Sequence, residues 1–148
     1  MREKEYRYAE RVMYGYKREA EKCAELAVEI AAMREKGDVQ GQNYRADIKA
    51  SGVMSDPVAR HVETIITLER KLSCLSRRVR AVDQLREDLA KKSVITITSP
   101  RNLLRILEEY YIAQATVSEF LIQTHWVRST YYVRRRELVI LMGEYLRA

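Results

Sequence analysis

Apolar residues repeat with helical spacing through residues 3–36 of the chain. They are separated alternately by three and four positions, and the intervening residues are mostly lysine, arginine and glutamate. This heptad pattern predicts one long helix with a narrow apolar stripe, of the kind that packs against a second helix. The stripe consists of Tyr6, Ala9, Met13, Tyr16, Ala20, Cys23, Ala27 and Ile30.

A second heptad stripe runs through residues 57–91, in Val58, His61, Ile65, Leu68, Leu72, Leu75, Val79 and Val82. Residues 37–57 lie between the two stripes, lack helical periodicity and contain three of the five glycines and one of the two prolines. They predict a long loop, which ends where Asp56 can cap the next helix and Pro57 can open it. Two heptad helices joined by a loop predict an antiparallel hairpin.

The predicted hairpin also has apolar residues outside its two heptad stripes. Val62, Ile66 and the N-terminal tyrosines would stay exposed in an isolated hairpin, which favours a homo-oligomer, with a dimer preferred. The alternative is that the C-terminal part of the chain folds back over these residues.

Residues 93–99 separate the hairpin from the C-terminal part. Their alternating sequence SVITIT would suit a short strand, but no partner strand is visible, so we expect an extended linker. Ser99 and Pro100 then predict the start of a third helix, whose apolar face contains Leu103, Leu104, Leu107 and Tyr111.

The last thirty-three residues, 116–148, predict two helices joined by a tight turn. Thr116 and Glu119 form a T-x-x-E capping box, which begins a short helix with Val117, Phe120 and Leu121 inward. A turn at residues 124–127 precedes a longer helix. The predicted fold is therefore all-α: a helical hairpin over residues 1–92 with its loop at 37–57, a linker at 93–99 and a helix-turn-helix domain at 100–148.

The N-terminal half of the last helix is rich in arginine and free of acid until Glu137. With Leu138 facing inward at about 100° per residue, Ser129 and Arg136 point outward, with Tyr132 and Val133 beside them. Arginine, hydroxyl and methyl groups on one face are suited to reading base edges and phosphates, whereas a solvated face would mix in glutamates. The candidate DNA-binding residues are Arg128, Ser129, Thr130, Tyr132, Val133, Arg135 and Arg136, with candidate phosphate contacts at Arg77, Arg78, Arg80 and Arg134.

Charge and composition narrow the function classes. The net charge is +6, and residues 1–57 are balanced, so the positive excess lies in the rest of the chain. No apolar run approaches the length of about 20 residues that a membrane span needs, and the polar N-terminus does not resemble a secretory signal, so we expect a cytoplasmic protein. Cys23 and Cys74 are expected to be buried thiols, while His61 and His125 stand alone. We expect no metal, no cofactor and no catalytic constellation.

Three stretches of the chain resemble the ArpU/RinA-type regulators of phage late transcription. They are residues 54–72, 101–111 and 116–138, and the most specific match is the Arg-Ser-Thr-Tyr-Tyr segment beginning at Arg128. The resemblance implies a C-terminal module similar to region four of bacterial sigma factors, which binds DNA upstream of the packaging and structural genes and activates transcription. The family commonly has serine where Val127 stands, and the turn here lacks glycine. The start of the last helix is therefore left open between Thr124 and Ser129.

The leading prediction is a sequence-specific transcriptional regulator that binds double-stranded DNA, with RNA polymerase as a candidate partner and the host bacterial cytoplasm as its location. A small terminase subunit for DNA packaging is the first alternative, because that class also combines a helix-turn-helix with coiled-coil oligomerisation. A coiled-coil adaptor without a nucleic-acid role would explain residues 1–91, but it gives no reason for the arginine face.

Overall fold

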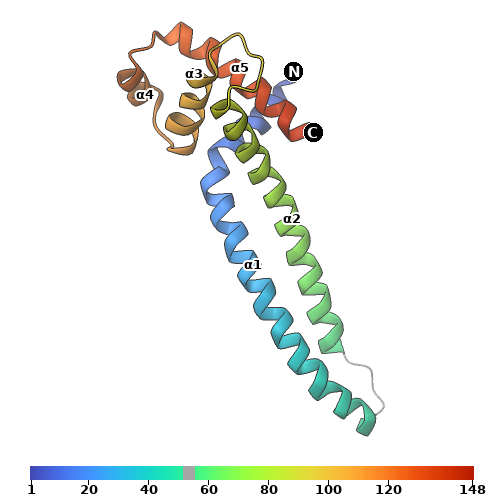
Figure 1. Cartoon of the computed structure of the whole chain (residues 1–148). Helices are drawn as coiled ribbons and strands as arrows, with labels where there is room; N and C mark the ends of the chain where they lie inside the picture. The colour runs from blue at the N-terminus through green and yellow to red at the C-terminus, as the bar shows by residue number, and fades with distance from the viewer. Residues whose placement is uncertain (52–55) are drawn as a thin grey trace. The chain divides into compact units, whose positions relative to one another are not determined.

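The computed structural model of the chain describes the backbone of residues 1–51 and 56–148, and the side chains of residues 1–36 and 57–148. It is all-helical, and the described backbone contains no strand, which confirms the predicted fold class. In order, the elements are α1 (Glu3–Ser51), α2 (Asp56–Ala90), α3 (Pro100–Arg105), the π-helix η1 (Ile106–Ile112), α4 (Val117–Thr124) and α5 (Arg128–Arg147) (Figure 1).

The chain divides into two compact units. The first combines Met1–Glu19 with Arg77–Ala148, and the second is Ala20–Ser76. This division differs from the predicted boundary at residues 92 and 93, because the N-terminal turns of α1 and the C-terminal turns of α2 share a core with the helices that follow. Each long helix thus contributes to both units.

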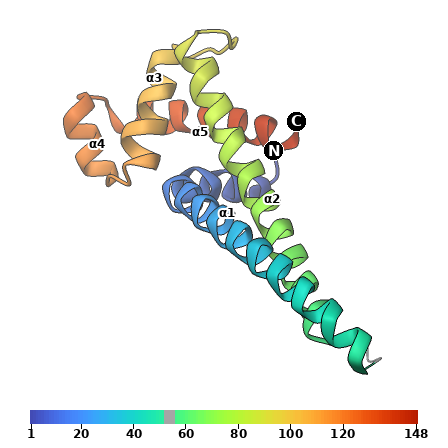
Figure 2. The ribbon, with the colours of Figure 1, turned by 60° about the horizontal axis from the view of Figure 1, so that its bottom comes forward.

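In the second unit, α1 and α2 run side by side (Figures 1 and 2). Leu26 and Ile30 are buried between them, and an ion pair joins Arg34 to Glu69. Leu26 takes the place predicted for Ala27, which is exposed, because a straight α-helix drifts from an exact seven-residue repeat. The ring of His61 bonds through Nε2 to the Met33 carbonyl oxygen at 2.7 Å, as expected of a histidine at the edge of a core.

Two predictions for the hairpin are wrong. The loop predicted at residues 37–57 is helical as far as Ser51, and only residues 52–55 lie outside the described backbone. Each of the two glycines in this helical stretch costs a helix about 1 kcal/mol relative to alanine, whereas only proline, at about 3 kcal/mol, is a strong breaker, and the first proline is Pro57. Cys74, expected to be buried, is exposed, and Cys23 is half-buried. The predicted cap at Asp56 lies outside the described side chains.

The first unit is built around one core, to which the ends of α1 and α2 and all the C-terminal helices contribute. Its largest fully buried side chains include Met13, Leu85, Leu103, Phe120 and Met142. Each such side chain contributes roughly 1.5–3 kcal/mol when it leaves water. Tyr6, Tyr14 and Tyr16 pack against this core. The sequence left open whether the N-terminal tyrosines are covered by a second copy or by the C-terminal part of the same chain, and for these three residues the second alternative is correct. The two termini lie close together on this unit (Figures 1 and 2).

The third helix begins at Pro100, as predicted, but widens into a π-helix at residues 106–112. The amide of Ala113 bonds to the Glu108 carbonyl five residues back, at 3.1 Å. The wider turn brings neighbouring residues to the same side, so that Tyr110 and Tyr111 are both buried, at 5% and 0% exposure. Heptad reasoning predicted Tyr111 inward but missed Tyr110.

The predicted capping box at the start of α4 is confirmed. The Thr116 hydroxyl accepts from the Glu119 amide, and the Glu119 carboxylate accepts from the Thr116 amide, both at 3.2 Å. The helix ends at His125, which has a left-handed backbone with φ of 59° and fills the place where glycine is usual. The last helix then begins at Arg128, with Val127 at its N-cap and no side-chain cap, so it starts from neither Thr124 nor Ser129, the two residues considered from the sequence.

Candidate nucleic-acid interface

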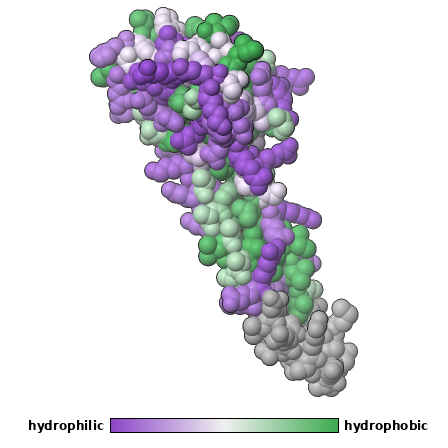
Figure 3. All heavy atoms as spheres, in the orientation of Figure 1, coloured by the Kyte–Doolittle hydropathy of each residue, from purple (hydrophilic) through white to green (hydrophobic). Residues whose placement is uncertain are grey.

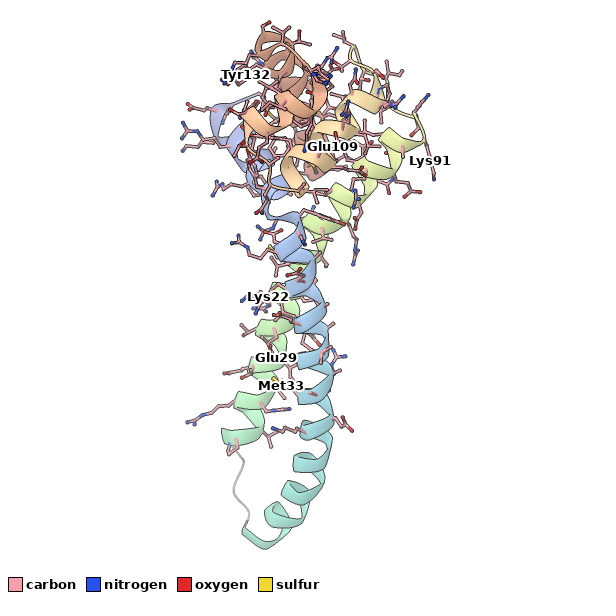
Figure 4. All side chains as sticks on the ribbon, turned by 90° about the vertical axis from the view of Figure 1, so that its left-hand side faces the viewer. Lys22, Glu29, Met33, Lys91, Glu109 and Tyr132 are labelled. Carbon is pink, nitrogen blue, oxygen red and sulfur yellow. The ribbon has the colours of Figure 1, made fainter. Side chains whose placement is uncertain are left out.

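One stripe of α5 is exposed over the N-terminal half of the helix. Ser129, Tyr132, Val133 and Arg136 repeat at spacings of three, one and three, and all four are exposed. Tyr132 keeps 47% of its surface and Val133 keeps 69%, both large values for apolar side chains; Figure 4 labels Tyr132 at the edge of the first unit. Arg128 is also exposed, one turn before Tyr132. We call these five residues the outer stripe.

The opposite side of α5 anchors the helix in the core. Tyr131, Leu138, Val139 and Met142 are fully buried, which confirms the inward position predicted for Leu138. The ring of Tyr131 lies 5.5 Å from the rings of both Tyr110 and Phe120. Tilted and edge-on contacts of this kind stabilise an aromatic cluster beyond the area they bury. The outer stripe therefore stands on a rigid support.

Arg135 lies in an internal network and not on the outer surface, contrary to its predicted role. Its Nη2 donates to both carboxylate oxygens of Glu10, at 2.9 and 3.1 Å, and its Nε donates to the Tyr111 hydroxyl at 3.1 Å. Only 20% of the Arg135 side chain and 15% of the Glu10 side chain remain exposed. At 100° per residue Arg135 falls on the shoulder of the helix, and the sequence pattern could not show that α1 supplies a carboxylate there.

The surroundings of Arg135 shift the pKa values of the groups in this network. Burial lowers the pKa of Arg135, but its neighbours Tyr111 and Glu10 outweigh that effect, so the pKa lies above its ordinary value. Burial raises the pKa of the Tyr111 hydroxyl, because the ionised form would lose its hydration. At neutral pH the network thus contains a charged guanidinium and a neutral phenol.

Arg134 occupies the other flank of the outer stripe. Its guanidinium carbon lies 4.4 Å from the centre of the Trp126 ring, a stacked arrangement that restricts the side chain. Trp126 in turn meets the buried Phe120 edge-on at 5.3 Å, so the turn at residues 124–127 is packed against the core. Among the described residues Arg134 makes no side-chain hydrogen bond or ion pair, so its N–H groups remain available to a partner.

The three arginines predicted as phosphate contacts on α2 differ in their environment. Arg77 and Arg80 are exposed. Arg78 is not an outward contact: its Nη1 pairs with Glu19 at 3.2 Å, and the two side chains keep 28% and 15% of their exposed area. The spacing of the three residues on one helix dictates this result, because Arg78 lies a helical turn from the buried Val82.

The linker at residues 93–99 is neither helix nor strand, as predicted, but it bends at Val94, Ile97 and Thr98 and is not an extended segment. It contacts α5 through Glu137. The Glu137 carboxylate accepts hydrogen bonds from the backbone amides of Ile97 at 2.7 Å and Thr98 at 3.0 Å. Ile95 and Ile97 are fully exposed, while the alternate residues of the linker are half-buried. The acid that follows the outer stripe in the sequence is therefore engaged with the linker. The alternating pattern of SVITIT was the only sequence signal for this arrangement.

A metal-binding cluster and a membrane-spanning helix are both absent from the described part of the chain. Its side chains include no group of three or more histidine, cysteine or acidic residues arranged to hold a metal ion. None of the described helices combines the length and apolar character needed to cross a membrane.

No family model, curated protein or solved structure matches the chain.

Proposed function

We propose that the chain is a DNA-binding transcriptional regulator in which α4, the turn at residues 125–127 and α5 act as a helix-turn-helix. The observation that carries the proposal is the outer stripe, an exposed, acid-free set of residues on a helix whose opposite side is fully buried. In such a module the second helix enters the major groove and the first crosses the DNA backbone.

The chemistry of the outer stripe suits base reading. Arg128 and Arg136 can donate two hydrogen bonds each to a guanine edge, the commonest specific contact in the major groove. Ser129 and Tyr132 carry hydroxyls that can donate or accept, and Val133 offers methyl groups for contact with thymine. These five residues replace the seven drawn from the sequence, because Arg135 is used internally and Thr130 is half-buried beside the outer stripe.

The resemblance to ArpU/RinA-type regulators supports a more specific role as an activator of phage late genes, with RNA polymerase as a candidate partner. It rests on residues 54–72, 101–111 and 116–138. A small terminase subunit is the alternative, since it would use the same outer stripe on packaging DNA. A coiled-coil adaptor would leave the outer stripe without a role.

We also propose that the second unit pairs with a second copy of the chain. Val28, Val62 and Ile66 keep 71%, 49% and 41% of their surface exposed, and apolar surface extends along both helices of this unit (Figure 3). In residues 20–36 the exposed charges are mainly acidic, whereas on α2 they are mainly basic. On α1 they are Glu21, Glu25, Glu29 and Glu35, against the exposed Arg34 and Lys36; in residues 57–76 of α2 they are Arg60, Arg70 and Lys71, against the exposed Glu63. In a two-fold pair, α1 of each copy would face α2 of the other with opposite charges.

The DNA-binding proposal is tested by selecting bound duplexes from fragmented source genome and measuring affinity by fluorescence anisotropy. Arg136→Ala should weaken binding to the selected duplex by roughly 1–3 kcal/mol and relax the base preference at one position. Arg18→Ala removes another exposed arginine, from α1, and should leave that preference unchanged. The proposal fails if the parent selects no sequence, or if both variants behave alike.

Sedimentation of the same protein tests the pairing. We expect a dimer that Ile66→Glu converts to a monomer without loss of helicity by circular dichroism. A monomeric parent at micromolar concentration would exclude the pairing. A closed ring of many copies would favour the packaging alternative over the regulator.

A further inference from the structure

An open pocket of about 280 Å³ lies between the linker and α5, next to the outer stripe. Thr98 lines it from the linker, and Ser129, Thr130, Val133 and Arg134 line it from α5. Three of these five side chains end in hydroxyls and one in a guanidinium, while none is acidic. All four polar groups can donate hydrogen bonds, and the guanidinium adds a permanent positive charge. This combination favours an anion with several acceptor oxygens.

The pocket is held in shape by contacts that leave its donors available. Stacking on Trp126 restricts Arg134 without using its N–H groups. The Glu137 carboxylate holds the amides of Ile97 and Thr98, and the Thr96 hydroxyl donates to the Thr98 carbonyl oxygen at 2.6 Å. Because Thr98 is fixed through its backbone, its side chain can line the pocket in a defined position. A preorganised site of this kind loses little entropy when an anion binds.

We propose that this pocket binds a phosphate of the DNA backbone, and that the linker is therefore a second DNA-contacting element beside α5. The inference rests on the proposed function. Ser129 and Val133 belong both to the outer stripe and to the pocket lining, so a helix that inserts its outer stripe in the major groove brings the pocket to the strand at the groove's edge. Phosphate contacts at that edge fix the register of a recognition helix without carrying sequence information.

Two substitutions separate the charge from the hydroxyl contribution. Arg134→Gln should weaken binding to selected and unrelated duplexes by the same factor, about tenfold, and should reduce the slope of log affinity against log salt by about one. Thr98→Val should weaken both duplexes by about three- to tenfold with the slope unchanged, since it removes only a neutral hydroxyl. Thr98→Ser keeps the hydroxyl and should bind like the parent.

Matched controls lie outside the pocket. Arg18→Gln removes a charge from an exposed position of α1, and Thr67→Val removes a hydroxyl that donates to its own helix at Glu63; neither should change affinity or salt slope by these amounts. Far-UV circular dichroism and thermal melts of every variant should match the parent. If Thr98→Val melts early, Thr98→Ser and Arg134→Gln still decide the question.

The outcomes show whether the phosphate-binding proposal fails alone or together with the DNA-binding proposal. A parent that binds DNA, with Arg134→Gln and Thr98→Val equal to it in affinity and salt slope, would overturn the pocket and leave the regulator proposal in place. A parent that binds no duplex would overturn both. The pocket could take a phosphate of the DNA backbone or a free phosphate ion. Titration with inorganic phosphate, followed through the amide resonances of Thr98 and Ser129, distinguishes the two. Saturation at micromolar phosphate would indicate a site for a free anion and would contradict a backbone contact.

Discussion

The ion pair between Glu10 and Arg135 connects the first helix to the helix that carries the outer stripe, and its removal should destabilise the first unit strongly. Glu10→Gln keeps the shape of the side chain and removes its charge. The guanidinium of Arg135 would then remain among the rings of Tyr131 and Tyr132, with its carbon 6.0 Å from each ring centre, and without a counter-charge. A guanidinium cannot lose its proton at any accessible pH, so it cannot escape the penalty by neutralisation.

The expected loss in the free energy of unfolding follows from how deeply the ion pair is buried. Breaking one side of a buried ion pair costs about 3–5 kcal/mol. The two side chains keep 20% and 15% of their exposed area, and glutamine can still accept one hydrogen bond, so we expect a loss of about 2–4 kcal/mol in the free energy of unfolding. For a chain of this length that corresponds to a fall of roughly 5–15 °C in melting temperature.

Urea unfolding followed by the fluorescence of Trp126 is the suitable assay, because this single tryptophan packs against Phe120 in the core of the first unit. Glu5→Gln is the matched control: its carboxylate lies 4.0 Å from Arg147, with side chains 47% and 61% exposed, and its loss should cost less than about 1 kcal/mol. Adding Arg135→Met to Glu10→Gln should recover part of the lost stability. Equal midpoints for Glu10→Gln and Glu5→Gln would refute the assignment of Arg135 to the interior.

Three further predictions concern local features of the first unit. Thr116→Ala removes the capping box and should lower the free energy of unfolding by about 1 kcal/mol in the same urea assay; an unchanged midpoint would mean that the cap is redundant. His125→Gly relieves a left-handed residue and should raise stability by up to about 1 kcal/mol, whereas a loss would show that the histidine makes a contact worth more than the strain. Burial raises the pKa of Tyr111 and Tyr131, so their contribution to stability is present below an unfolded-state pKa of about 10 and declines as pH rises above it. Phenolate absorbance should therefore increase on unfolding at alkaline pH, and equal titration curves for folded and unfolded chains would contradict this.

Local rules were sufficient for most of the helices. The heptad stripes, the proline at position 100 and the Thr116–Glu119 box predicted where helices form, because each depends on residues close in sequence. The same rules placed Ser129 and Arg136 outward and Leu138 inward, since helical geometry alone sets the angle between them. They failed at residues 37–51, where weak breakers were not strong enough to end a helix, and at Tyr110, where a π-helix changes the angle per residue.

The amino-acid sequence by itself therefore determined the all-α class and the face of α5 that looks outward, because both follow from periodicity within single segments. Only the tertiary structure decided which arginines remain exposed and which pair with carboxylates of the same chain. Glu10 lies 125 positions from Arg135, and Glu19 lies 59 positions from Arg78, and no local pattern reveals pairings over such distances. The same holds for the pocket at Thr98, which exists because the Glu137 carboxylate, 39 positions along the chain, binds the backbone of the linker.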